Sequence, residues 1–293
     1  MASTTTCAQF ETGHMDTVHD AQFDYYGKHV ATCSSDRLVK IFSVTGSQVN
    51  HMADLVGHQG PVWEVSWCHP RHGSLLASCG FDGSIMIWQQ NTQGGQWQQI
   101  YQTESNDASV NSIAWAPYEL GLVVAGATAD GRIIIVENTG GTWVTSTIQH
   151  AHPVGATGVS WAPVTSSYHV RRLATCGCDS TVKLWVYDEA NQMWNQDGAA
   201  LVGHSDWVRS VEWAPSAGLS ATPCLASAGE DGQVIVWKQS GQAEWRQTIV
   251  HRFGTPVWKA SWSTNGSILS VTDAQQHVSM WKEVSNGVWK EVY

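Results

Sequence analysis

Charged residues, and basic ones above all, are scarce in this 293-residue sequence. Only 14% of its residues are charged, and 15 Lys and Arg stand against 25 Asp and Glu. The net charge of −10 has the wrong sign for neutralising phosphates, so nucleic acid is not an expected partner. The sequence also lacks the long apolar run of a membrane span and the basic flank of a secretory signal. These absences predict a soluble, non-secreted protein without direct membrane insertion.

Cysteine provides no framework either. The seven cysteines are scattered and are never spaced Cys-x-x-Cys, so neither a disulfide scaffold nor a zinc finger is predicted. Cys176 and Cys178, with His169 nearby, come closest to a metal-binding cluster. Their spacing is wrong for tetrahedral zinc, and packing is the favoured interpretation. We expect no metal and no cofactor.

Tryptophan, in contrast, is abundant: 17 Trp accompany 7 Tyr and 5 Phe. So many large rings are typical of a repeated structural unit. A phrase of the form apolar-Ala-Ser/Thr-x-x-x-Asp-x-x-apolar-x-apolar-aromatic recurs, with some variation, every 44 to 52 residues. This spacing is close to that of WD repeats, roughly 40–45 residues. The six copies are Val30–Phe42, Leu76–Trp88, Val124–Val136, Leu173–Trp185, Leu225–Trp237 and Leu269–Trp281.

Within each unit, short runs alternate apolar and polar residues with a period of two. Val62–Trp67 is one such run, and turns such as Asp82-Gly83 join the runs. Each unit therefore reads as four antiparallel strands, and radial repetition of such units gives an all-β, six-bladed WD-repeat β-propeller. We expect one propeller domain over residues 1–293, with blades at about 13–56, 57–104, 105–150, 151–202, 203–251 and 252–293.

A count of strands suggests that the ring is open. In this kind of repeat, the segment before each Gly-His forms the outer strand of the preceding blade. Residues 1–12 then hold a leading strand, at residues 5–12, that belongs to a blade before the first. Residues 287–293 already supply an outer strand to the last blade. Two segments compete for one place, so the first and last blades keep edges free to pair with another chain.

Three blades carry a His, a Ser or Thr, an Asp and a Trp that resemble a hydrolase triad. An active site seldom recurs once in each structural unit, and no nucleophile elbow or oxyanion-hole motif accompanies these residues. We interpret them as buried hydrogen-bonded tetrads and expect no enzyme activity. The tetrads are His58, Ser78, Asp82 and Trp88; His152, Thr175, Asp179 and Trp185; and His204, Ser227, Asp231 and Trp237.

Four stretches go beyond the generic repeat: 19–27 (HDAQFDYYG), 31–42 (ATCSSDRLVKIF), 57–63 (GHQGPVW) and 204–209 (HSDWVR). With them, the chain resembles the Sec thirteen family of WD-repeat proteins over essentially its whole length. The resemblance implies a non-enzymatic scaffold of the COPII vesicle coat, which carries cargo from the endoplasmic reticulum to the Golgi, and of the Y-shaped complex of the nuclear pore. Its implied partners are large helical-solenoid proteins of those two assemblies, with a nutrient-signalling complex at the lysosome or vacuole as a further one. The implied locations are endoplasmic reticulum exit sites, COPII vesicles and the nuclear envelope.

In that family the partner inserts strands that complete the open propeller as a seventh blade. We therefore predict binding by β-augmentation, at the edge near residues 5–12 and along the sixth blade. The alternative is a closed WD-repeat adaptor that presents a peptide or partner on one face, where Trp63, Trp207 and Trp258 would lie near the entrance of an inner strand. The candidate partner-binding residues are Cys7, Gln9, Phe10, Val257, Trp258, Val278 and Met280.

Overall fold

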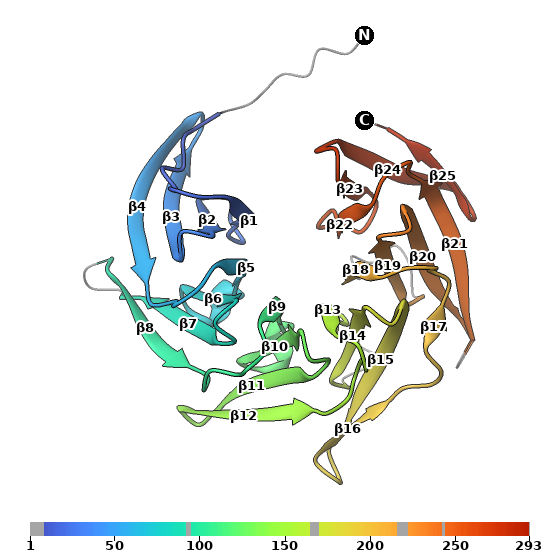
Figure 1. The fold of residues 1–293 in the computed structure, drawn as a ribbon, viewed down its shortest axis with the longest axis horizontal. Coiled ribbons are helices and arrows are strands. Elements are labelled where there is room, and N and C mark those ends of the chain that lie inside the picture. Colours follow the sequence, from blue (N-terminus) through green and yellow to red (C-terminus); the bar gives the residue numbers. More distant parts are fainter. Residues whose placement is uncertain (1–8, 92–94, 165–169, 216–221, 242–243, 293) are drawn as a thin grey trace.

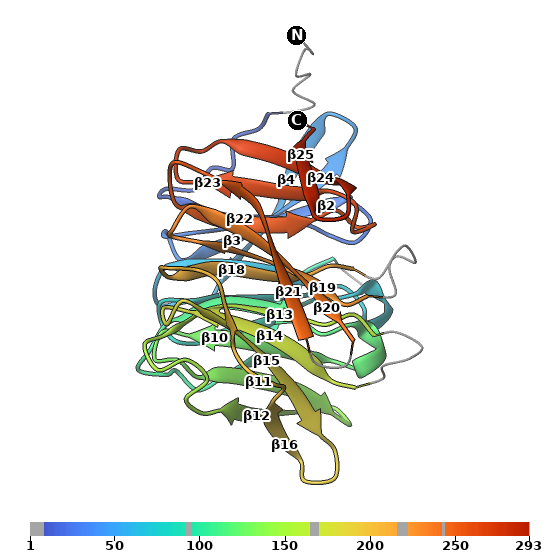
Figure 2. The same ribbon diagram turned by 90° about the vertical axis from the view of Figure 1, so that its right-hand side faces the viewer.

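The computed structural model describes residues 9–91, 95–164, 170–215, 222–241 and 244–292. These residues form six antiparallel sheets arranged around an axis, which confirms the predicted six-bladed propeller (Figure 1). Seen from the side, the sheets stack one behind another around that axis (Figure 2). No helix in this part of the chain is long and apolar enough to span a membrane.

The first three sheets, or blades, each contain four strands in a simple up-and-down order. The first is β1 (Val18–Phe23), β2 (His29–Ser34), β3 (Leu38–Thr45) and β4 (Gln48–Val56). The second is β5 (Val62–Trp67), β6 (Leu75–Gly80), β7 (Ile85–Gln90) and β8 (Trp97–Gln102), with the short 3₁₀ helix η1 (Pro70–His72) after β5. The third is β9 (Val110–Trp115), β10 (Val123–Thr128), β11 (Ile133–Thr139) and β12 (Thr142–Ile148), with η2 (Tyr118–Leu120) after β9.

The last three blades repeat this order, and the fourth adds a two-residue strand that pairs with β15. The fourth is β13 (Ala156–Trp161), β14 (Arg172–Gly177), β15 (Thr181–Asp188), β16 (Met193–Gln196) and β17 (Leu201–Val202). The fifth is β18 (Val208–Trp213), β19 (Cys224–Gly229), β20 (Gln233–Ser240) and β21 (Glu244–Arg252). The sixth is β22 (Val257–Trp262), β23 (Leu269–Asp273), β24 (Val278–Ser285) and β25 (Val288–Glu291).

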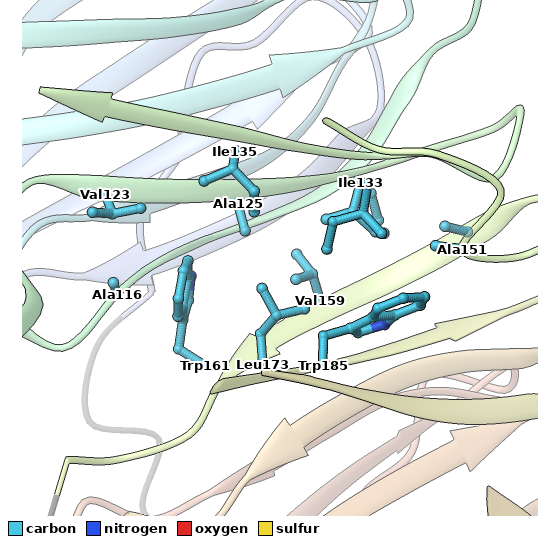
Figure 3. Close-up of a cluster of buried hydrophobic side chains, with 13 residues drawn as sticks. Ala116, Val123, Ala125, Ile133, Ile135, Ala151, Val159, Trp161, Leu173 and Trp185 are labelled. Carbon is cyan, nitrogen blue, oxygen red and sulfur yellow. The ribbon is translucent and has the colours of Figure 1, made fainter. Parts of the chain in front are cut away.

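A hydrophobic core fills the space between each pair of neighbouring blades rather than the space within a blade. Between the third and fourth blades, for example, Ile133 and Ile135 pack against Val159 and Leu173 (Figure 3). Five such clusters join the six blades in sequence. A sheet with two apolar faces is stable only when both faces are covered, so each blade depends on its neighbours.

Tryptophan side chains on the inner strands add a hydrogen bond between blades. The indole N–H of Trp67 donates to the backbone carbonyl of Gln22 in the preceding blade at 3.0 Å. The same link joins Trp115 to Ser66, Trp161 to Ala114 and Trp262 to Glu212, at 3.0, 3.0 and 3.2 Å. We call this repeated contact the indole link. Trp213 holds the same position in the fifth blade, but its indole nitrogen has no hydrogen-bond partner among the described residues, so the link joins four of the five neighbouring pairs.

The ring is open between its two ends, as the sequence predicts. Contacts between inner strands run from β1 to β5, β9, β13, β18 and β22, and no sheet of the described residues contains strands of both the first and the last blade. Figure 1 shows the first blade in blue and the last in red, facing each other across the opening.

The predicted leading strand is not seen. Residues 1–8 lie outside the described residues, and residues 9–12 form no strand. The first blade is already complete with β1 to β4, so this segment has no strand of a preceding blade to pair with. Val136 stands in the place of the repeat's aromatic in the third blade, and Gln275 in the place of the turn Asp in the sixth, yet both blades have four strands. In the sixth blade, Asp273 accepts the turn hydrogen bonds from the backbone of Gln275 and His277, each at 2.9 Å.

A candidate partner-docking slot

The sixth blade presents an apolar face that no other blade covers. Val278 and Met280 on β24 are 60% and 38% exposed. The corresponding residues of the fifth blade, Val234 and Val236, are fully buried against the sixth. The same two strand positions are therefore buried where the fifth blade meets the sixth, and exposed on the free face of the sixth blade. This face forms one side of what we call the slot.

The first blade forms the other side. Val18 on β1 is 40% exposed, whereas its counterpart in the second blade, Val62, is fully buried against the first. Part of this face is covered by the chain itself, because the ring of Phe10 lies 5.1 Å from that of Phe42. Gln9 beside it is exposed.

Phe10 occupies the place that an outer strand takes elsewhere. In the second blade, Leu55 of the preceding outer strand packs in one cluster with Trp88, and Phe42 is the counterpart of Trp88. Residues 9–12 thus lie against the first blade without forming a strand. Cys7 lies outside the described residues.

Two of the predicted partner-binding residues are not on the slot faces. Val257 is fully buried in the cluster between the fifth and sixth blades, so its prediction as a partner contact is wrong. A β-bulge between Val257 and Lys259 breaks the alternation of β22 and turns Val257 toward the fifth blade. Trp258 is half-exposed and lies at the mouth of the central channel, where the Arg209 guanidinium stands 4.9 Å from its ring.

Three tryptophans, Trp63, Trp207 and Trp258, lie at the mouth of the channel. Arg209 also lies 5.1 Å from the ring of Trp207, so it is held between two indoles by cation–π contacts. Trp63 packs edge-on against His19 at 4.6 Å. The channel below them is a cavity of about 350 Å³ lined by the inner strands.

The structure brings each predicted tetrad together. In the second blade, His58 Nδ1 lies 2.9 Å from Asp82 Oδ2, and His58 Nε2 lies 2.8 Å from Ser78 Oγ. The indole of Trp88 donates to the same Ser78 oxygen at 2.8 Å. Because an indole only donates and a carboxylate only accepts, a neutral imidazole orders the chain from Trp88 through Ser78 and His58 to Asp82. Every polar group of the tetrad has a hydrogen-bond partner, and Ser78 is fully buried.

The other two tetrads have the same geometry. His152 bridges Asp179 and Thr175 at 2.8 Å each, and His204 bridges Asp231 and Ser227 at 3.0 and 2.8 Å. Trp185 and Trp237 donate to the hydroxyls of Thr175 and Ser227 at 2.9 Å. Burial alone would raise the pKa of the Asp231 carboxyl, but the hydrogen bonds that it accepts from His204 and from the backbone N–H groups of Ser205 and Gln233 together outweigh burial and lower the pKa to about 2. The pKa values of Asp82 and Asp179 are also held well below the usual range, by His58 and His152.

The first blade holds a fourth, incomplete network that was not predicted from the sequence. His14 bridges Asp36 at 2.8 Å and Thr32 at 2.9 Å, while Phe42 takes the place of the tryptophan. The Gly-His pair at residues 13–14 was the signal that could have identified it. A phenyl ring has no N–H to donate, so this network ends at the threonine.

The pair Cys176 and Cys178 forms no cluster with a described histidine. Cys176 is fully buried on β14, and burial raises the pKa of its thiol to about 12. A thiol with so high a pKa remains protonated at neutral pH and is a poor metal ligand. His169 lies outside the described residues.

Comparisons with known proteins agree with this architecture. The profile described as "WD domain, G-beta repeat" matches residues 5–43, 49–89, 142–186 and 196–238. The "Protein SEC13 homolog" of Drosophila melanogaster is 43% identical over 298 residues, which cover 96% of this chain and 82% of that protein. The chain belongs to the SEC13 family of WD-repeat proteins.

Fungal members of the SEC13 family show a similar likeness. The "Protein transport protein SEC13" of Mycosarcoma maydis is 39% identical, with 96% of this chain and 92% of that protein covered. The "Protein transport protein sec13" of Emericella nidulans is also 39% identical, with 96% and 95% covered. The Sec thirteen resemblance read from four short stretches thus extends along the whole chain.

Proposed function

We propose that this SEC13 family member is a non-enzymatic scaffold subunit of a vesicle coat, and that a helical-solenoid partner fills its slot with a seventh blade. The observation that carries the proposal is the exposure of Val278 and Met280, whose counterparts are buried wherever two blades meet. Relatives that share nearly the full length of the chain are named protein transport proteins, which supports the transport role.

The finer assignments follow the family resemblance. We propose the outer cage of COPII vesicles at endoplasmic reticulum exit sites as one assembly, and the Y-shaped nuclear pore scaffold as a second. In both, a solenoid partner would use the same slot, so the two roles would be mutually exclusive for one molecule. A nutrient-signalling complex at the lysosome or vacuole is a further proposed setting.

The slot favours packing of a partner's sheet against the faces of the first and sixth blades over backbone pairing with their edge strands. The first and sixth blades each have their full set of four strands, so they offer side chains to an incoming sheet. Apolar burial on Val278, Met280 and Val18 would supply most of the affinity. Backbone pairing in the sense of β-augmentation is left to the segment around Gln9 and Phe10, which forms no strand here.

A peptide-presenting adaptor is the second candidate function, and the stack of Arg209 between Trp207 and Trp258 favours it. A closed ring, as first envisaged for an adaptor, is wrong for this chain, because no sheet of the described residues joins the two ends. An open propeller with a rim site is the form of this alternative that the structure allows.

The test is a substitution in the slot with a matched one outside it. Met280→Asp places a charge on the slot face and should abolish capture of solenoid coat proteins from cytosol, as identified by mass spectrometry. Val144→Asp on β12 introduces the same charge at another exposed valine and should leave capture unchanged. Deletion of residues 1–12 should weaken capture while leaving the propeller folded. Equal capture by wild type and Met280→Asp would overturn the proposal.

A further inference from the structure

Lys259 reaches across the central channel from the last blade to the first two. It lies on the inner strand β22, and its Nζ donates to Glu64 Oε1 at 3.0 Å and to Asp20 Oδ1 at 3.2 Å. Glu64 lies on β5 and Asp20 on β1. Among the described residues, these are the ion pairs that connect the two ends of the open ring.

Both carboxylates are held in place by the blade that follows them. The second oxygen of Glu64 accepts the backbone N–H of Ile113 at 2.8 Å, and the second oxygen of Asp20 accepts that of Val65 at 3.3 Å. Each acid is therefore fixed at one oxygen and offers the other to Lys259. An ammonium that meets two such fixed acceptors loses less freedom in bonding than it would with mobile surface partners.

The three groups come from one position of the repeat. Asp20, Glu64 and Lys259 each lie three residues before the inner-strand aromatic of their blade, directly after the β-bulge. The bulge turns this position into the channel. In the sixth blade the position carries the opposite charge to the first two, which is what allows the ends to attract each other.

The balance of charge in the channel depends on this single lysine. Asp20, Glu64 and Glu212 line the cavity together with two cations, Lys259 and Arg209. Arg209 pairs with Glu230 at 2.7 Å, so Lys259 is the cation that bonds to the channel carboxylates. Without Lys259, the carboxylates of the first, second and fifth blades would face one another uncompensated. Like charges repel. The repulsion would push the first and last blades apart, because no sheet of the described residues joins them.

We propose that Lys259 is a positioning residue for the slot: it keeps the first and sixth blades at a fixed separation before a partner arrives. This inference rests on the proposed function of the slot. It adds how the ring without a partner keeps its first and last blades in the arrangement that binds one. Preorganisation raises apparent affinity because a larger fraction of the free chain is competent to bind.

The experiment compares Lys259→Met with Lys282→Met, which removes the same charge from an exposed position of the same blade. Hydrogen exchange is followed on the free, full-length chain. Lys259→Met should speed exchange in β1 and β22 by about tenfold, the equivalent of about 1.4 kcal/mol of local stability, and leave β9 to β16 unchanged. Lys282→Met should change none of these, and Lys259→Arg should restore most of the protection.

Binding to the purified solenoid subunit is the second readout. Lys259→Met should weaken affinity by about tenfold if a ring with separated ends becomes the main free form, and Glu64→Gln should weaken it by less, because the ion pair of Lys259 with Asp20 remains. The double variant should be little weaker than Lys259→Met alone, because Glu64 has no ion pair to lose once Lys259 is gone. Unchanged exchange and affinity in Lys259→Met, or additive losses in the double variant, would overturn the inference.

The two proposals fail in different ways. If the wild-type chain does not bind the solenoid subunit, the proposed function falls, while exchange in the free chain still reports on the link. If wild type binds and Lys259→Met binds equally well with native exchange, the slot stands and the role of Lys259 falls.

Discussion

The hydroxyl of Ser78 lies 2.8 Å from both the indole nitrogen of Trp88 and Nε2 of His58. This one buried hydroxyl thus accepts a hydrogen bond from Trp88 and bonds to the imidazole of His58. The imidazole in turn bonds to Asp82 in the turn. This junction, rather than a catalytic role, accounts for the repetition of Ser or Thr at the same place in three blades.

Ser78→Ala should therefore lower the free energy of unfolding by about 2–3 kcal/mol, because it leaves two buried polar groups without a partner. Urea unfolding followed by tryptophan fluorescence measures the change. Ser43→Ala, at an exposed hydroxyl 3.5 Å from its acceptor, is the matched control and should have almost no effect. Equal stability of the two variants would mean that the tetrad contributes nothing.

The indole link predicts a difference between two similar tryptophans. Trp161 donates to the Ala114 carbonyl at 3.0 Å, whereas the indole nitrogen of Trp213 has no hydrogen-bond partner in the described part of the chain. Both rings are buried. Trp161→Phe should thus cost about 1 kcal/mol more than Trp213→Phe, since only the first loses a hydrogen bond. Equal costs in urea unfolding would show that packing alone matters at this position.

Gly131 should tolerate no side chain, because a Cβ there would clash with a neighbouring blade as well as strain the backbone. It has φ +85°, and an added Cβ would stand 1.6 Å from the carbonyl oxygen of His152 in the next blade. Gly140, at φ +61°, has open space around it. Gly140→Ala should cost about 1–2 kcal/mol from the left-handed backbone alone, and Gly131→Ala about 3 kcal/mol or more. Thermal unfolding of the pair separates conformational strain from steric clash.

The channel carboxylate Glu212 should give the protein an unusual pH dependence. Burial raises its pKa to about 7, against 4.5 for the ordinary group. Between these values the folded state binds more protons than the unfolded state, so stability falls as pH rises from about 4.5 to 7, by at most about 1.4 kcal/mol per pH unit.

Glu212→Gln should remove this fall, because a neutral amide still accepts the Trp262 N–H that Glu212 accepts at 2.8 Å. The measurement is the free energy of unfolding at several pH values across that window. Glu291→Gln, at an exposed position, should leave the wild-type slope intact. A Glu212→Gln variant that keeps the full slope would place the responsible group elsewhere.

Local repetition made most of the fold predictable. Each blade carries its own turn, tetrad and aromatic within about 50 residues, so an alignment of the sequence on itself identifies the six units. Val278 and Met280 could be placed on one face because they lie two residues apart in β24. Val257 was misplaced because the bulge in β22 breaks that alternation, and bulges leave no clear mark in the sequence.

The contacts of Lys259 lay beyond sequence reasoning for another reason. It meets Glu64 and Asp20 only after six blades have curved around the axis, and no local pattern encodes that curvature.

Phe23 is the one inner-strand aromatic of the six blades that is not a tryptophan. If two copies joined head to tail, the first blade of one would follow the sixth blade of the other, in the contact that every internal pair of blades makes. Such an interface does not close on itself and would propagate into a filament. Phe23 has no N–H, so a second copy would meet the sixth blade without the indole link that joins four of the five neighbouring pairs of the chain's own blades. The first blade is therefore a poorer continuation of the series than most of the chain's own blades.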